Sequence, residues 1–91
     1  MNLRLRLTAR ERELICEFGY PFQDVQEQLD RLAATRAARI VHISSYFFDM
    51  LLADLSRSER EVKNRRLLAE LDELYAELES QALRQGHTVG A

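Results

Sequence analysis

The chain changes from strand to helix within the stretch Leu3-Arg4-Leu5-Arg6-Leu7-Thr8-Ala9-Arg10-Glu11. Leucine and arginine alternate over residues 3–7, and this period of two predicts a strand with one buried face and arginines on the other. Thr8 and Glu11 have the spacing of a capping box, in which the hydroxyl accepts from the Glu11 amide and the carboxylate accepts from the Thr8 amide. We therefore expect a short strand that leads directly into a helix.

Apolar residues at helical spacing lie on both sides of the segment Gly19-Tyr20-Pro21-Phe22. Gly19 is predicted to end the first helix in a left-handed conformation, and Pro21 suits the first turn of the next helix. The second helix has a clear apolar stripe, which consists of Phe22, Val25, Leu29, Leu32 and Ala33. The segment is therefore interpreted as a tight corner between two helices.

Residues 40–44 are rich in β-branched side chains and predict a second strand. Ser44 or Ser45 can cap a third helix, which is apolar on nearly every side from Tyr46 to Leu55. A fourth helix is expected from about Glu59 to Arg84, entered through a capping box at Ser56 or Ser58 and ended by Gly86. One long bent helix from Tyr46 to the C-terminus is the alternative, because no Gly or Pro interrupts this part of the chain.

Together these elements predict a mainly α fold, a small bundle of three to four helices with a minimal two-stranded sheet at about residues 3–7 and 40–44. The strands could pair within one chain or between two chains. An all-α bundle is the alternative fold class. We expect residues 1–85 to form a single helical domain and residues 86–91 to form a flexible C-terminal tail.

The composition is that of one small soluble domain, with 91 residues, 46% hydrophobic residues and a formal net charge of -2. Cys16 is the single cysteine, so neither an intrachain disulfide nor a cysteine-based zinc site can form. The most apolar stretch falls short of the roughly 20 residues that span a bilayer, and no secretory signal pattern opens the chain. A cytoplasmic location without membrane contact is therefore expected.

Residue types that carry chemistry are few and lie on separate predicted elements: Cys16 in the first helix, His42 in the second strand and His87 in the tail. The three glycines do not form a glycine-rich phosphate loop. We therefore expect no enzyme and no catalytic, cofactor-binding or metal site.

The second half of the chain has two apolar features, the ring triplet Tyr46-Phe47-Phe48 and a leucine stripe that includes Leu71 and Leu78. Three consecutive rings cannot all point the same way on one helix, so at least one must reach the surface or a partner. These five residues are the candidate interface. They favour a small non-catalytic protein–protein interaction module that forms a homodimer or binds another protein, with a biological role that the sequence does not indicate.

The N-terminal segment supports a second hypothesis. Four arginines and one glutamate give residues 1–12 a charge of +3, and Arg4, Arg6, Arg10 and Arg12 are candidate anion contacts. The alternative function is thus a DNA-binding accessory or transcription-regulator-like protein. The net charge of -2 argues against nucleic-acid binding over the whole surface, so only a local patch could support it.

Overall fold

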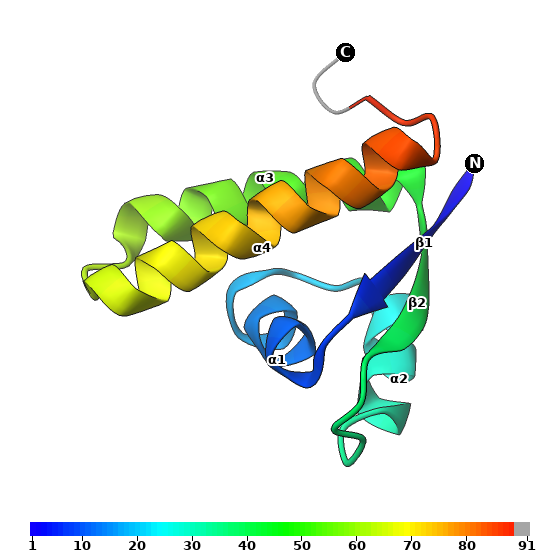
Figure 1. Ribbon diagram of the computed structural model, residues 1–91, viewed down its shortest axis with the longest axis horizontal. Helices are drawn as coiled ribbons and strands as arrows, with labels where there is room; N and C mark the ends of the chain where they lie inside the picture. The colour runs from blue at the N-terminus through cyan, green and yellow to red at the C-terminus, as the bar shows by residue number, and fades with distance from the viewer. Residues whose placement is uncertain (89–91) are drawn as a thin grey trace.

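The computed structural model of the chain describes residues 1–88, and the predicted tail residues 89–91 lie outside this range. It has six elements, β1 (Asn2–Leu7), α1 (Ala9–Phe18), α2 (Gln23–Arg31), β2 (Arg39–Ser44), α3 (Ser45–Glu61) and α4 (Arg65–Arg84). Helices α3 and α4 form a long antiparallel hairpin that crosses over α1 and reaches the sheet, while α2 lies beside β2 (Figure 1). The predicted fold class, a mainly α chain with a minimal two-stranded sheet, is confirmed.

The two strands pair antiparallel within one chain, with Asn2 opposite Ser44 and Leu7 opposite Arg39. The period of two holds along β1 and from Ile40 to Ile43 of β2. The inner face is buried under the helices and carries Leu3, Leu5, Leu7, Val41 and Ile43. Burying these side chains removes apolar surface from water and fixes the register, because a slip by one residue would turn them outward. The all-α alternative is therefore wrong.

Two glutamines of α4, one turn apart, close the free edge of β1. The Arg6 amide donates to Gln81 Oε1 at 2.7 Å, and Gln81 Nε2 donates to the Arg6 carbonyl at 2.9 Å. Gln85 forms the same two bonds with the amide and carbonyl of Arg4. The backbone groups that would otherwise recruit a further strand are thus satisfied by side chains.

The opposite edge of the sheet is closed in the same way. The His42 amide donates to Gln28 Oε1 and Gln28 Nε2 donates to the His42 carbonyl, both at 2.8 Å. Because Gln28 belongs to α2, each edge of the sheet is covered by a helix on its own side. A two-stranded sheet alone is marginally stable, and these helices supply the pairing that further strands would provide.

The corner between α1 and α2 differs in part from the prediction. The capping box of Thr8 and Glu11 is present, but Gly19 has φ -95° and ψ -178°, so it is extended and not left-handed. A Cβ at Gly19 would lie 2.6 Å from Leu51 Cδ1, so glycine is needed here because α1 ends close against α3. Pro21 precedes α2, which begins only at Gln23.

The break between the third and fourth helices lies further along the chain than expected. Ser44 caps α3 as predicted, but α3 continues through Glu61 and α4 begins after Asn64, whose side chain accepts from the amides of Arg66 and Leu67. Neither Ser56 nor Ser58 starts a helix, and the Ser58 hydroxyl instead donates to the Phe18 carbonyl at 2.7 Å. The alternative of one long bent helix is therefore wrong.

The end of the described chain is held against the hairpin. Gly86 has φ +86° and ends α4, as expected from the sequence. The ring of His87 lies 2.7 Å from Asp49 Oδ1 and edge-on to Phe48. Part of the predicted tail thus has contacts with α3, and residues 89–91 lie outside the described residues.

Candidate interaction surfaces

The five candidate interface residues do not share one surface. Tyr46 is 68% exposed and Phe47 is half-buried, whereas Phe48 is fully buried, as the divergence of three consecutive helical side chains requires. Leu71 and Leu78 of α4 are also fully buried in the core of the same chain. Phe48, Leu71 and Leu78 therefore cannot reach a partner in this fold, because one chain needs them to complete its own core.

Four aromatic side chains, Tyr20, Phe22, Tyr46 and Phe47, form a cluster at the start of α3. Phe22 and Phe47 stack with ring centroids 4.0 Å apart, while Tyr20 lies edge-on to Phe22 and Tyr46 lies edge-on to Phe47. Met50, one turn after Tyr46, is exposed as well. We call Tyr20, Phe22, Tyr46, Phe47 and Met50 the aromatic face. Its members are exposed or half-buried, so the face is open to a partner.

The aromatic face continues along the solvent side of α3. Five exposed residues follow one another at steps of four, three, four and three, and we call them the α3 stripe: Tyr46, Met50, Ala53, Arg57 and Arg60. The stripe is apolar in its first half and basic in its second. Acidic side chains border the apolar end, since Asp24 and Glu27 line a hollow of about 440 Å³ with Phe22 and Phe47.

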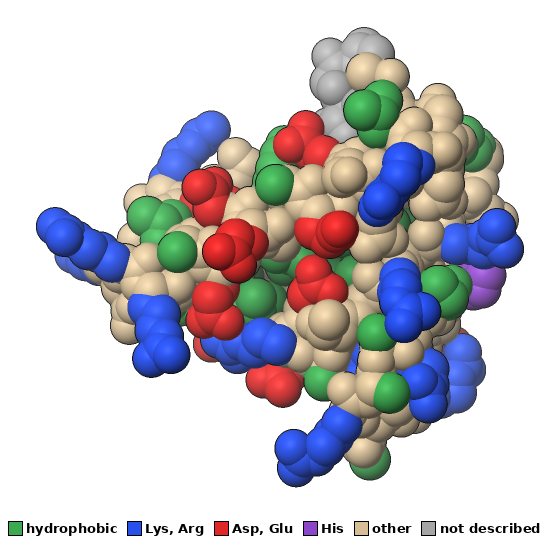
Figure 2. All heavy atoms as spheres, viewed as in Figure 1, with side chains coloured by type: hydrophobic (Ala, Val, Ile, Leu, Met, Phe, Trp, Pro, Cys, Tyr) green, Lys and Arg blue, Asp and Glu red, His purple; other side chains and the backbone are tan. Residues whose placement is uncertain are grey.

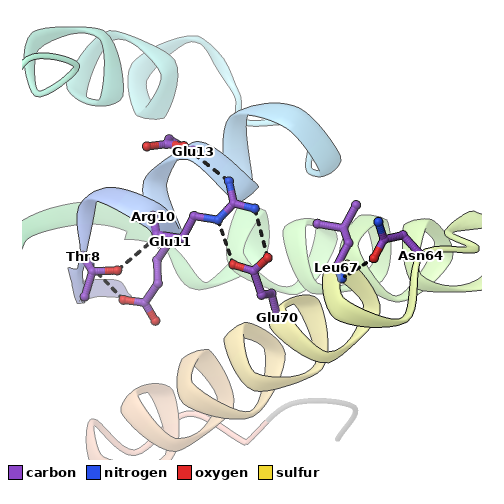
Figure 3. A network of polar contacts seen from close by, with 7 residues as sticks. All are labelled: Thr8, Arg10, Glu11, Glu13, Asn64, Leu67 and Glu70. Atoms are coloured by element: carbon purple, nitrogen blue, oxygen red, sulfur yellow. Dashed lines mark hydrogen bonds and ion pairs between the residues drawn. The ribbon is translucent and has the colours of Figure 1, made fainter.

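Of the four candidate anion contacts, Arg10 is already paired within the chain (Figure 3). Its Nε donates to Glu70 Oε2 at 2.8 Å and its Nη2 donates to Glu70 Oε1 at 3.0 Å, while Nη1 reaches Glu13 at 3.3 Å. The hydrogen bonds from Arg10 lower the pKa of the Glu70 carboxyl. Arg10 thus connects α1 to α4.

Arg12 is buried, with 5% of its surface exposed. Its guanidinium donates to the carbonyls of Leu7, Thr35 and Ala37, and so joins the end of β1 to the connection between α2 and β2. Arg12 therefore has a structural position and is not available to an external anion, which corrects the prediction for this residue.

Arg4 and Arg6 do face outward, and they lie beside two exposed residues of β2. The register places His42 opposite Arg4 and Ile40 opposite Arg6. We call these four residues the outer sheet face. They line a hollow of about 980 Å³ whose far wall is the C-terminal end of α4, with Glu77, Gln81, Arg84 and Gln85. Figure 2 shows basic side chains over the sheet and the end of α4, and a row of acidic side chains along α4.

The residues that could carry chemistry are not brought together. Cys16 is exposed on α1, and partial burial of its thiol raises the pKa of Cys16, which disfavours the reactive thiolate. His42 lies on the outer sheet face, while His87 is paired with Asp49. Within residues 1–88, no group of three or more His, Cys, Asp or Glu side chains is arranged to hold a metal ion.

Comparison with other proteins assigns the chain to no family. No protein-family model, no curated protein and no solved structure matches the chain. In the described part of the chain, no helix is both long enough and apolar enough to cross a membrane. The case for a function therefore depends on the surfaces themselves.

Proposed function

We propose that this chain is a small non-catalytic protein-interaction module that forms a homodimer through the aromatic face and the α3 stripe. The observation that carries the proposal is the exposed ring cluster, in which the stacked pair of Phe22 and Phe47 is flanked by the two most exposed tyrosines. Tyrosine and phenylalanine bury large area at low entropic cost, and they are enriched at the centre of protein interfaces.

The partner that fits best is a second copy of the chain, because the α3 stripe is complementary to itself. A two-fold axis at Ala53 would set two α3 helices antiparallel and bring Arg60 of one copy, with Arg57 and its ion-pair partner Asp54 beside it, over the rings and acids at the other end of the second copy. A guanidinium over an aromatic ring contributes about 0.5–2 kcal/mol, depending on how far it is desolvated. The small side chain of Ala53 would allow close helix approach at the axis.

The size of the surface is compatible with such a dimer. The α3 stripe from Tyr46 to Arg60 extends about 21 Å at the rise of an α-helix. The aromatic face widens it toward α2 through Phe22 and Tyr20. A stable interface buries roughly 800 Å² on each partner, so both features are needed together.

Light scattering coupled to size-exclusion chromatography tests the proposal at micromolar protein. The unmodified chain should have twice the mass of one chain, and the double variant Tyr46→Glu, Met50→Glu should have the mass of one chain. The matched control is Leu83→Glu, because Leu83 is 64% exposed on α4, outside the proposed interface, and this variant should stay dimeric. A monomeric unmodified chain would overturn the proposal.

Disulfide trapping tests the two-fold arrangement separately. In a Cys16→Ser background, Ala53→Cys should form a covalent dimer on mild oxidation, because the two introduced thiols would meet at the axis. The control is Ser80→Cys, on the exposed side of α4. This variant should form no covalent dimer, so it should migrate as a single chain in non-reducing denaturing electrophoresis. Efficient cross-linking at Ser80→Cys, without cross-linking at Ala53→Cys, would place the interface elsewhere and contradict the proposal.

A further inference from the structure

The outer sheet face has its side chains in two parallel rows. Arg4 and Arg6 form a cationic row on β1, two residues and therefore about 7 Å apart along the strand. His42 and Ile40 form the neighbouring row on β2, directly opposite them in the register. All four side chains are exposed, so the face presents fixed positive charge beside an aromatic and apolar strip.

The hollow over this face is lined by charges of both signs. Gln85 pairs with Arg4, which places the end of α4 beside Arg4. Glu11 and Glu77 line the hollow too, and Glu11 is held at the Thr8 end by the capping box. Arg84 lies 4.0 Å from Glu77, at the outer limit of an ion pair. An anion in the hollow would therefore be attracted to Arg4, Arg6 and Arg84 and repelled by Glu11 and Glu77.

The cationic row is free of carboxylate partners. Among the described ion pairs of residues 1–88, those of arginine belong to Arg10, Arg57 and Arg84, and neither Arg4 nor Arg6 takes part. The glutamines at the two edges of the sheet already satisfy the backbone of Arg4, Arg6 and His42. A ligand would consequently meet the side chains on the face of the sheet, since an added strand would find these edge groups occupied.

We infer that the outer sheet face binds single-stranded nucleic acid. Arg4, Arg6 and Arg84 neutralise successive phosphates, while unstacked bases pack on His42 and Ile40 across the sheet. Cationic groups that follow the backbone, beside a ring on which a base can stack, are features with which proteins hold single strands, and here His42 supplies the ring while Ile40 adds apolar contact. A duplex hides its base faces in the stack, so it could use only the arginines. No residue of the aromatic face or the α3 stripe is involved, and this inference does not depend on the homodimer.

Fluorescence anisotropy with short labelled single strands of RNA and of DNA tests the inference. Three phosphate contacts predict that the logarithm of the binding constant falls with the logarithm of salt concentration with a slope of about -2. The double variant Arg4→Gln, Arg6→Gln should lose tenfold or more in affinity, and its slope should fall to about -0.7. Lys63→Gln, Arg65→Gln is the matched control, since it removes the same charge from the hairpin tip and should bind like the unmodified chain.

The base contacts have their own readout. His42→Ala should weaken binding severalfold with little change in the salt slope, because it removes a stacking surface and keeps all three arginines. Circular dichroism checks that each variant keeps its helices. The inference is overturned if single strands do not bind at low salt, or if the hairpin-tip control loses as much affinity as the sheet variant. The inference is also overturned if duplex binds as tightly as single strands, or if a polyglutamate peptide competes as well as an unlabelled single strand. Either result would show that the outer sheet face binds anions in general.

Discussion

Gln85 forms with Arg4 the pair of hydrogen bonds that a neighbouring strand would form. The Arg4 amide donates to Gln85 Oε1 at 2.9 Å, and Gln85 Nε2 donates to the Arg4 carbonyl at 2.8 Å. Gln81 repeats this arrangement at Arg6, one helical turn earlier on α4. Helix α4 therefore lies along β1 in the position of a third strand, and it holds the outer sheet face at a fixed distance from Arg84.

Replacing both glutamines of α4 should destabilise the sheet. Gln81→Met, Gln85→Met keeps the length and helix propensity of the side chains but removes the four hydrogen bonds to β1, together with the bond from Gln85 Nε2 to the Gln81 carbonyl. At about 1 kcal/mol for each bond, we expect a loss of roughly 2–4 kcal/mol in the free energy of unfolding, measured with urea. The opened edge should also cause concentration-dependent aggregation. Gln23→Met is the control, since that side chain only contacts Glu27 at 3.4 Å, and an unchanged urea midpoint in the double variant would contradict the prediction.

The buried guanidinium of Arg12 should be among the most sensitive polar positions. Arg12→Met leaves the carbonyls of Leu7, Thr35 and Ala37 without their donor, which predicts a loss of about 3 kcal/mol in the free energy of unfolding. Arg12→Lys should recover only part of this stability, because one ammonium cannot reproduce the planar fork that reaches three carbonyls. Arg10→Met, at an exposed ion pair, should cost much less. If both methionine variants unfold alike, Arg12 does not have this role.

Adding a single methyl group at Gly19 should destabilise the contact between α1 and α3. The extended φ allows alanine, but its Cβ would lie 2.6 Å from Leu51 Cδ1 and 2.9 Å from the Ile15 carbonyl oxygen. We expect Gly19→Ala to cost about 1–3 kcal/mol in chemical denaturation. In a Leu51→Ala background the cost should shrink, since part of the clash is removed. Additive effects of the two substitutions would show that the contact with Leu51 is not the cause.

Acid should weaken the pairing of α1 with α4. The pKa of Glu70 is lowered in the folded chain, so its contribution to stability is complete above the ordinary value of 4.5 and is lost as the pH falls through the folded pKa. Glu70→Gln should therefore be less stable than the unmodified chain at pH 7 at low salt, and the difference should vanish in acid. Glu73→Gln, also on α4, serves as control. A difference that persists in acid would exclude the ion pair as its source.

Several elements of the fold are determined by residues close together in the sequence. The alternation of leucine and arginine defines β1, and the hydroxyl of Thr8 and the carboxylate of Glu11 define the start of α1, three residues apart. The outward position of Arg4 and Arg6 follows from the same alternation. These features are predictable because a strand has a period of two and a cap bonds only to its own first turn.

Features that depend on contacts across the fold were not predictable from local patterns. Gln81 and Gln85 lie where the end of α4 meets β1, but the partner of Gln85 lies 81 residues earlier in the chain. Likewise, the local sequence predicts a left-handed helix end at Gly19, but the position of α3 is what requires glycine there. Arg12 is predicted to be a surface charge, but the connection after α2 buries it. Sequence alone thus determined the alternation in β1, the caps of α1 and α3 and the charges. Tertiary packing decided which arginines are occupied and which rings are exposed, because burial is set by distant neighbours.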